Sequence, residues 1–318
     1  MTIEQQVAIA AQHIQQGRLV AFPTETVYGL GANALNPMAV AKIFEAKRRP
    51  SFDPLIVHIA SIDSIHSLTQ DLDERVFRLA KKFWPGPLTL VLPKSDLVPS
   101  IVSAGLQTVG IRMPSHRVAL DLIEKAGCPI AAPSANLFGR LSPTCASHVR
   151  KQLPDIDFII DGESPSVGIE STIVSLNSKG AEVLRHGVIT QEEIESVVPL
   201  YKPPKEERKD VVAPGLLKSH YSPSKPLFML GEALPSAFRR HNAGLLTFSG
   251  TDTEGFRIVE RLTEAMDLKE AAVNLFAAMH RMDESDVEYV VAEPIPRQGI
   301  GIAIMDRLTK AAYRYRVV

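Results

Sequence analysis

The sequence is poor in cysteine and has no long apolar run. Its 318 residues include only two cysteines, Cys128 and Cys145, which form no CxxC pair. A disulfide framework and a cysteine-based zinc site are therefore not predicted, and a reducing cytosolic compartment is expected. No apolar run is long enough to span a membrane, and the first 17 residues resemble a helix ended by Gly17 rather than a signal peptide. We expect a soluble, cytoplasmic protein with no membrane partner.

The sequence also lacks an excess of charge of either sign. It contains 35 Lys and Arg residues against 36 Asp and Glu residues, for a formal net charge of −1. A broad basic surface for nonspecific nucleic-acid binding is therefore not indicated, although a local basic groove stays open as an alternative. With 45% hydrophobic and 22% charged residues, the composition is that of an ordinary globular protein with a sizeable core.

Several catalytic motifs are missing. The sequence has no GxxxxGK[ST] loop, no GxSxG elbow and no HExxH pair, so it does not support a P-loop nucleotidase, a serine hydrolase or a zinc protease. The segment 298–304 is similar to a dinucleotide-binding fingerprint, but Ile304 stands at the third glycine position and no strand follows the predicted helix. We interpret this segment as a helix start.

The most informative stretch of the sequence is 18–54. Its apolar residues 19–22 predict a short buried strand, which Pro23 ends. The following loop, 24–31, offers three hydroxyl groups, one carboxylate and two glycines. Such a loop lets backbone N–H groups approach a ligand closely.

A helix is predicted directly after this loop. Asn36 is a good N-cap and Pro37 suits the first helical position, so the helix should run to about Ala46. It delivers three cations at 47–49. The loop and the cations together indicate an anionic-ligand site, or a simple turn beside a basic helix end favoured by the helix dipole.

The remaining chain predicts two bodies. Strands and helices interleave through 1–200, which indicates an α/β fold with a mixed sheet covered by helices. The segment 201–224 is rich in proline and charge and is predicted to be a linker. Residues 225–318 predict a smaller, Rossmann-like α/β domain. Within it we expect strands over 226–230, 243–248 and 287–292, and helices over 233–240, 267–282 and 301–314.

Cations and hydroxyl groups stand at the predicted ends of several strands. Ligand-binding groups gather at such ends in open sheets, and phosphate binding favours Lys and Arg. Taken together they indicate an anionic substrate, although each alone is more typical of a surface ion pair. The residues are Lys47, Arg49, Arg112, Ser134, Asn136, Ser142, Ser171, Thr172 and Arg185.

Ten blocks resemble one family in their order, in a match that spans about residues 5–200 and continues into the HYSP linker. They are FPTETVYGLG, AKRRP, FDPLIVHI, FWPGPLTLVL, TVGIRMP, APSAN, SPT, GIESTIV, LRHG and PGLLKSHYSP. The chain is identified by them as a member of the YrdC-like L-threonylcarbamoyl-AMP synthases, in the long form with a C-terminal domain. The resemblance implies a YrdC-like twisted mixed sheet. It also implies condensation of L-threonine, bicarbonate or CO₂, and ATP to threonylcarbamoyl-AMP and pyrophosphate, for N6-threonylcarbamoyladenosine in tRNA.

The resemblance also assigns residues. The family's KxR and SxN signature falls on the expected catalytic residues Lys47, Arg49, Ser134 and Asn136. L-Threonine is expected beside Thr26, His58, Arg112, Ala132 (through its backbone) and Ser171. ATP is expected beside Arg49, Asp53, Thr108, Ser134, Ser142, Arg185 and the linker residues His220 or Tyr221.

The same resemblance implies Mg²⁺ with the ATP, but no metal site on the protein itself. The downstream partners would be tRNA and a threonylcarbamoyl transferase complex. Because a carbamate is labile in water, we hypothesise that the HYSP segment of the linker forms a lid over the nucleotide.

Two positions depart from the family pattern. Arg48 stands where the family often has glycine, so the local turn is expected to differ. Asp53 stands where the family often has asparagine, and a carboxylate there would repel phosphates unless a cation lies beside it.

Two alternatives compete with this interpretation. The first is a binding protein for double-stranded RNA or tRNA, or a ribosome-maturation factor, that uses 47–49 in a basic concavity. The second is another carbamoyl-transfer enzyme of the kind found in hydrogenase maturation, which would need Cys- and His-rich segments that the sequence lacks.

Overall fold

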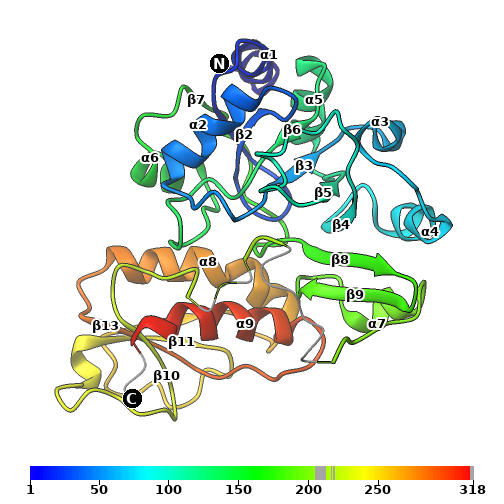
Figure 1. The fold of residues 1–318 in the computed structure, drawn as a ribbon. Coiled ribbons are helices and arrows are strands. Elements are labelled where there is room, and N and C mark those ends of the chain that lie inside the picture. The colour runs from blue at the N-terminus through cyan, green and yellow to red at the C-terminus, as the bar shows by residue number, and fades with distance from the viewer. Residues whose placement is uncertain (205–212, 216, 218, 316–318) are drawn as a thin grey trace.

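The computed structural model describes residues 1–204, 213–215, 217 and 219–315. Its elements form two bodies, each built around one sheet, with the N-terminal body above the C-terminal one in Figure 1. The charge run predicted at 205–210, together with Leu216 and Lys218 of the predicted lid, lies outside the described residues. No helix in the described ranges has the length and apolar character that crossing a membrane requires.

The first body contains a nine-stranded mixed sheet in the order β7-β1-β2-β6-β3-β5-β4-β8-β9. The sheet has parallel pairs (β1/β7, β3/β5, β4/β8) among antiparallel ones, which confirms the predicted mixed α/β sheet. The strands are β1 (Val20–Phe22), β2 (Gly29–Asn33), β3 (Ile56–His58), β4 (Leu88–Pro93), β5 (Thr108–Arg112), β6 (Ile130–Ala131), β7 (Phe158–Ile159), β8 (Thr172–Asn177) and β9 (Gly180–Arg185).

Helices cover both faces of this sheet because successive strand residues point to opposite sides. Val20 and Phe22 of β1 pack with α1 and α5 in one apolar cluster, whereas Ala21 packs with residues of α2 and α4 in another. The helices are α1 (Ile3–Gln15), α2 (Pro37–Lys47), α3 (Ile65–Leu68), α4 (Glu74–Phe83), α5 (Arg117–Ala126), α6 (Ala146–Gln152) and α7 (Gln191–Glu195), with a 3-10 turn at Ile62–Ser64.

The predicted helix α2 forms as expected. The Asn36 side chain accepts hydrogen bonds from the N–H groups of Met38 and Ala39, and Pro37 occupies the first turn. The helix ends at Arg48, whose φ of 52° places it in the left-handed conformation. Arg48 therefore makes the turn that glycine would make more easily, and this turn sends Arg49 back toward the sheet.

The second body holds a four-stranded parallel sheet in the order β10-β13-β11-β12, as a Rossmann-like prediction requires. Its elements are β10 (Leu227–Met229), β11 (Ala243–Thr247), β12 (Ile258–Arg261), α8 (Leu268–Glu284), β13 (Tyr289–Ala292) and α9 (Gly301–Ala312), with 3-10 turns at Arg240–Asn242 and Tyr313–Tyr315. The glycines of 298–304 do begin a helix, α9, as predicted.

One predicted helix in this body is wrong. Residues 233–240 form turns rather than a helix. Pro235 lies inside this segment, where it has no N–H group to donate, and its carbonyl instead accepts a turn hydrogen bond from the Phe238 N–H. The strand β12 was not predicted, because its half-buried alternating residues follow a run of turn-forming residues.

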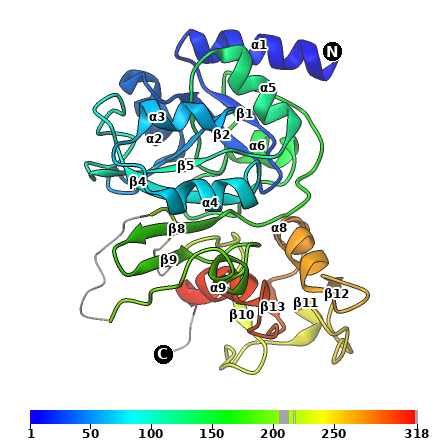
Figure 2. The ribbon, with the colours of Figure 1, turned by 90° about the vertical axis from the view of Figure 1, so that its right-hand side faces the viewer.

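The two bodies share an apolar core. Val27, Leu141 and Ile169 of the first body lie in the same buried cluster as Leu275 and Phe276 of α8. Figures 1 and 2 both place the β8–β9 hairpin beside α9, so the edge of the large sheet meets the second body. One close approach is at Gly168, which has a φ of +77° and where an added Cβ would lie 2.4 Å from the backbone of Val273 in α8.

This contact gives a stability test. The variant Gly168→Ala should lose clearly more unfolding free energy than Gly105→Ala, measured as the shift in urea midpoint. Gly105 has a similar φ of +82° but open space around it, so it isolates the conformational penalty of about 1 kcal/mol. The backbone clash at 168 should add about 1–3 kcal/mol. Equal losses at the two positions would contradict this close packing of the bodies.

Candidate functional site

A cavity lies at the junction of the two bodies and holds about 580 Å³ of empty space, counting the part open to solvent. Nearly all of its walls come from strand ends and from the segment between the bodies. The lining residues are Thr24, Thr26, Val27, Gly29, Arg49, Pro54, Ile56, His58, Arg112, Ala132, Pro133, Ser134, Glu170, Ser171, Arg185, Pro214, Gly215, His220 and Tyr221.

The strand register explains why distant residues meet here. Parallel pairing of β3 with β5 places His58 beside Arg112, at the ends of the two strands. Ile56 is two residues earlier on the same face, and with Val91, Ile173 and the linker residue Ala213 it forms an apolar cluster at the base of the site.

Ten of the predicted site residues line this cavity. They are Thr26, Arg49, His58, Arg112, Ala132, Ser134, Ser171, Arg185, His220 and Tyr221. Five others lie outside the lining: Lys47, Asp53, Thr108, Asn136 and Ser142. Four of these five contact residues of the cavity wall or brace the loop that carries Ser134: Lys47, Asp53, Asn136 and Ser142. The fifth, Thr108, lies at the start of β5 on the same sheet face as Arg112.

Lys47 fixes the loop that carries Ser134 and Asn136. Its buried ammonium donates to the carbonyl oxygens of Ser134 and Asn136, each at 2.5 Å. The Asn136 amide continues this bracing by donating to the carbonyls of Leu137 and Arg140. Burial, with Arg49 nearby, lowers the pKa of Lys47 well below its ordinary value. The KxR and SxN segments are thus one connected unit.

Arg49 and Asp53 form a buried ion pair with an Nη2–Oδ1 distance of 3.0 Å. Arg49 also donates from Nε to the Asp53 carbonyl and from Nη2 to the Pro54 carbonyl. The carboxylate of Asp53 therefore lies beside a cation and away from the cavity surface, which removes the expected repulsion between Asp53 and phosphates.

Arg112 is held by two residues of the loop after β1. Its Nη2 lies 2.7 Å from Oε1 of Glu25, and its Nη1 donates to the Thr26 hydroxyl at 3.0 Å. The Thr26 hydroxyl also bonds that of Thr24 at 2.9 Å. Sequence reasoning did not assign Glu25 to the site, although it noticed one carboxylate in this loop. Any ligand carboxylate at Arg112 must share the guanidinium with Glu25.

Among the described residues, Arg185 is bound only by neutral acceptors. It donates from Nε to the Ser171 carbonyl, from Nη2 to the Ser171 hydroxyl and from Nη1 to the Pro214 carbonyl, at 3.1–3.3 Å. The Ser171 hydroxyl also bonds that of Thr89 at 2.8 Å. Arg185 forms no ion pair with a carboxylate of the described residues. It is thus a cation at the cavity wall that can meet an anionic ligand.

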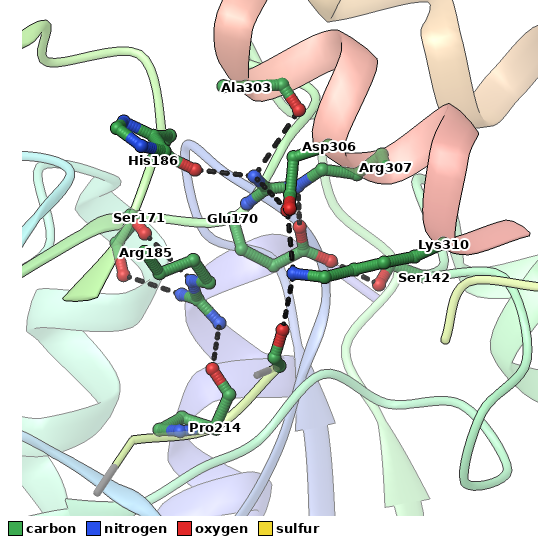
Figure 3. A network of polar contacts seen from close by, with 11 residues as sticks. Ser142, Glu170, Ser171, Arg185, His186, Pro214, Ala303, Asp306, Arg307 and Lys310 are labelled. Atoms are coloured by element: carbon green, nitrogen blue, oxygen red, sulfur yellow. Dashed lines mark hydrogen bonds and ion pairs between the residues drawn. The ribbon is translucent and has the colours of Figure 1, made fainter. Parts of the chain in front are cut away.

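Ser142 lies behind the wall and supports Glu170. Its hydroxyl donates to Oε1 of Glu170 at 2.5 Å, while Oε2 lies 3.1 Å from Nε of Arg307 in α9 (Figure 3). Burial opposes ionisation of Glu170, but Arg307 and then Arg185 outweigh it and hold its pKa below the ordinary value. Glu170 was not predicted, although it directly precedes Ser171 in the GIESTIV block.

Two buried histidines offer uncharged ring nitrogens to a ligand. Burial, followed by repulsion from Arg112, lowers the pKa of His58 to about 3. Burial, with Arg49 as the next cause, lowers the pKa of His220 well below 6.5. Nδ1 of each ring has no hydrogen-bond partner among the described residues. His220 packs edge-to-face against Phe138 and Tyr221, which orients it over the cavity.

The residues present do not form a metal site. Within the described ranges, no three His, Cys, Asp or Glu side chains gather as ligands for an ion. Both oxygens of Glu170, the carboxylate that lines the cavity, are already held by Ser142 and Arg307.

Sequence reasoning missed most of the apolar and backbone parts of the wall. Val27, Pro54, Ile56 and Pro133 are apolar residues that a sequence pattern cannot distinguish from core. Pro214 and Gly215 were within a quoted block, but nothing in the sequence predicts that the Pro214 carbonyl faces Arg185.

Comparisons with known proteins cover nearly the whole chain. One family model, described as "Telomere recombination", matches residues 12–187, and a second, "Threonylcarbamoyl-AMP synthase, C-terminal domain", matches 189–313. Threonylcarbamoyl-AMP synthases of Pyrococcus abyssi and Bacillus subtilis are each 43% identical to the chain, covering 99% and 98% of it and 96% and 94% of their own lengths. The crystal structure of P. abyssi Sua5 complexed with L-threonine has a TM-score of 0.88 at 41% identity, covering 99% of this chain and 96% of that one.

The buried state of His58 predicts a pH dependence of stability. Its pKa is about 3 in the folded protein and near 6.5 when unfolded, so the unfolded state binds the extra proton between these values. Stability therefore falls as the pH drops from 6.5 toward 3, by up to about 1.4 kcal/mol per pH unit from this group. When the pH drops from 6.5 to 4.5, the unfolding free energy of His58→Gln should fall by about 2–3 kcal/mol less than that of the wild type. Urea unfolding at the two pH values measures both falls.

The same substitution at the exposed His66 serves as the control. His66→Gln should keep the full difference in unfolding free energy between the two pH values. If His58→Gln keeps it too, His58 is not the neutral buried group described above.

Proposed function

The chain belongs to the threonylcarbamoyl-AMP synthase family, and we propose that the cavity between its two bodies is where this reaction takes place. L-Threonine, bicarbonate or CO₂, and ATP would enter it, and threonylcarbamoyl-AMP and pyrophosphate would leave. The observation that carries the proposal is the convergence of Thr26, Arg112, Ser134, Ser171 and Arg185 on one cavity.

L-Threonine is proposed to bind at the end formed by β3, β5 and the loop after β1. P. abyssi Sua5, the similar structure, holds L-threonine. In this chain Arg112 would bind the carboxylate through its guanidinium fork. The hydroxyl groups of Thr26 and Ser171, the uncharged His58 and the backbone of Ala132 complete that end of the cavity.

ATP is proposed to bind at the end formed by Arg49, Ser134, Arg185 and the linker residues His220 and Tyr221. Arg185 would contact phosphate directly, because no carboxylate of the described residues pairs with it. Asp53 and Ser142 would contribute indirectly, through Arg49 and Glu170. Thr108 would extend the nucleotide site along the sheet face of Arg112. Mg²⁺ would accompany the ATP phosphates rather than bind to protein side chains.

The chemistry asks for positioning and charge stabilisation rather than a covalent nucleophile. With CO₂, the threonine amine adds and loses a proton to give a carbamate. With bicarbonate, the amine proton and the bicarbonate hydroxyl leave together as water and give the same carbamate. A carbamate oxygen then attacks the α-phosphorus, and pyrophosphate leaves. Arg49 and Arg185 would stabilise the charge on the phosphates, while Lys47 and Asn136 hold the Ser134 loop in place.

The segment between the bodies is proposed to close the site. Pro214, Gly215, His220 and Tyr221 already line the cavity, and Tyr221 is 1% exposed. A closed site would protect the carbamate from water. The proposed catalytic, lid and C-terminal segments are 1–200, 201–224 and 225–318. The protein is proposed to act in the cytoplasm. Its product would pass to a transferase complex that modifies tRNA.

The RNA-binding alternative gains no support from the basic segment 47–49. Lys47 and Arg49 are buried, 1% and 9% exposed, and are bonded within the chain. Only Arg48 of the three is exposed. A basic concavity built from these three residues is therefore absent.

Pyrophosphate release with each amino acid in turn tests the proposal. Release should depend on L-threonine, and valine, which lacks the hydroxyl, should support it at least about a hundredfold less well. Arg112→Met should raise the KM for threonine by about tenfold or more, because a charge-assisted fork is lost, and should change the KM for ATP much less.

Arg117→Met, at an exposed arginine of α5 with a carboxylate partner, is the matched control and should resemble the wild type. Release that is independent of the amino acid, or a threonine KM unaffected by Arg112→Met, would contradict the proposal.

A further inference from the structure

Arg307 is a fully buried arginine that belongs to the second body. It lies in α9 with 0% exposure, in the set of polar contacts drawn in Figure 3. Its Nε pairs with Glu170, its Nη1 donates to the carbonyl oxygen of His186, and its guanidinium lies 5.5 Å from the ring centre of Tyr221. An arginine is almost never fully buried unless it is paired. The ion pair with Glu170 is therefore what allows Arg307 to be buried here.

Glu170 in turn lies close to Arg185, the cavity cation that has no carboxylate partner in the part of the chain that the structure describes. The following residue, Ser171, accepts two hydrogen bonds from Arg185, through its carbonyl and its hydroxyl. Glu170 and Arg185 both line the cavity. With Arg307 in place, the two oxygens of Glu170 are occupied by Arg307 and Ser142, so Arg185 is not drawn into an ion pair.

Removing the Arg307 charge would change this balance. A buried carboxylate without a counterion is strongly destabilised, so a cation beside it is drawn toward it. Arg185 is such a cation, because it bonds the adjacent Ser171, lines the same cavity and interacts electrostatically with Glu170. Arg185 would then be neutralised by the protein itself and be less able to bind an anion.

We propose that Arg307 is a positioning residue for the nucleotide: by neutralising Glu170 it keeps Arg185 available for the phosphates of ATP. The C-terminal body thus contributes to nucleotide binding through one buried charge, without touching the ligand. This inference rests on the proposed binding of ATP in the cavity and adds a role for a residue outside its lining.

The simpler interpretation is that Arg307 only joins the two bodies. The bodies already share an apolar cluster, and Lys310 of the same helix separately donates to the Gly215 carbonyl at 2.8 Å. A joining role would weaken the binding of threonine and ATP together. It would also make the double replacement of Arg307 and Glu170 no better for ATP than the single one.

Three variants separate these roles: Arg307→Met, Glu170→Gln and the double variant. Steady-state pyrophosphate release gives kcat and both KM values, and calorimetric titration with ATP gives its Kd. Arg307→Met should raise the KM and Kd for ATP at least tenfold, with the threonine KM and the kcat at saturating ATP changed less than threefold. Glu170→Gln alone should bind ATP more tightly than the wild type, because the carboxylate that competes with the phosphates for Arg185 is gone.

The double variant is the decisive one, because it removes both charges. Its Kd for ATP should return to within threefold of the wild type. An ATP Kd that stays as weak as in Arg307→Met would overturn the proposal, as would Arg307→Met with wild-type ATP binding. If Arg307→Met does not fold, the double variant alone decides: wild-type ATP affinity supports the proposal, and a tenfold loss overturns it.

Arg257→Met is the matched control, since Arg257 belongs to the same body and pairs with Asp286 at the surface. It should behave as the wild type in every measurement. If the wild-type protein releases no pyrophosphate with threonine, the proposed function fails. If it does so while the variants do not follow the charge pattern, only the role of Arg307 fails.

Discussion

The structure depends on how charges are compensated where the two bodies meet. Four buried arginines lie in or beside the cavity, and three of them have a carboxylate partner: Arg49 with Asp53, Arg112 with Glu25, and Arg307 with Glu170. Removing an ion from water costs several kcal/mol, so each pair is a requirement of burial more than a source of stability. Within the described part of the chain Arg185 is left without such a partner, and this is the charge that an anionic ligand can satisfy.

The sheet and the linker provide this arrangement without a dedicated catalytic nucleophile. Arg112 ends β5, Arg185 ends β9 and Ser171 immediately precedes β8, so strand pairing alone brings them together. The linker residues His220 and Tyr221 cover the same cavity from the other side. A reaction that needs two substrates held side by side in a dry environment is consistent with such a frame.

Much of the fold and part of the site could be predicted from the sequence. Local sequence patterns predicted the helix cap at Asn36 and the mixed sheet. The sequence blocks shared with the family identified the polar residues at strand ends. The ion pairs of Glu25 with Arg112 and of Glu170 with Arg307 could not be predicted. The partners are 87 and 137 residues apart in the chain, and nothing local selects them. The helix expected at 233–240 failed for a local reason, since Pro235 outweighs the apolar spacing around it.

A crystal structure of the protein with L-threonine and a non-hydrolysable ATP analogue tests the central claim most directly. Both ligands should occupy the one cavity, with the threonine carboxylate at Arg112, the phosphates at Arg185, and Glu170 still paired with Arg307. Phosphates bound away from Arg185, or ligands on separate surfaces of the two bodies, would contradict the account.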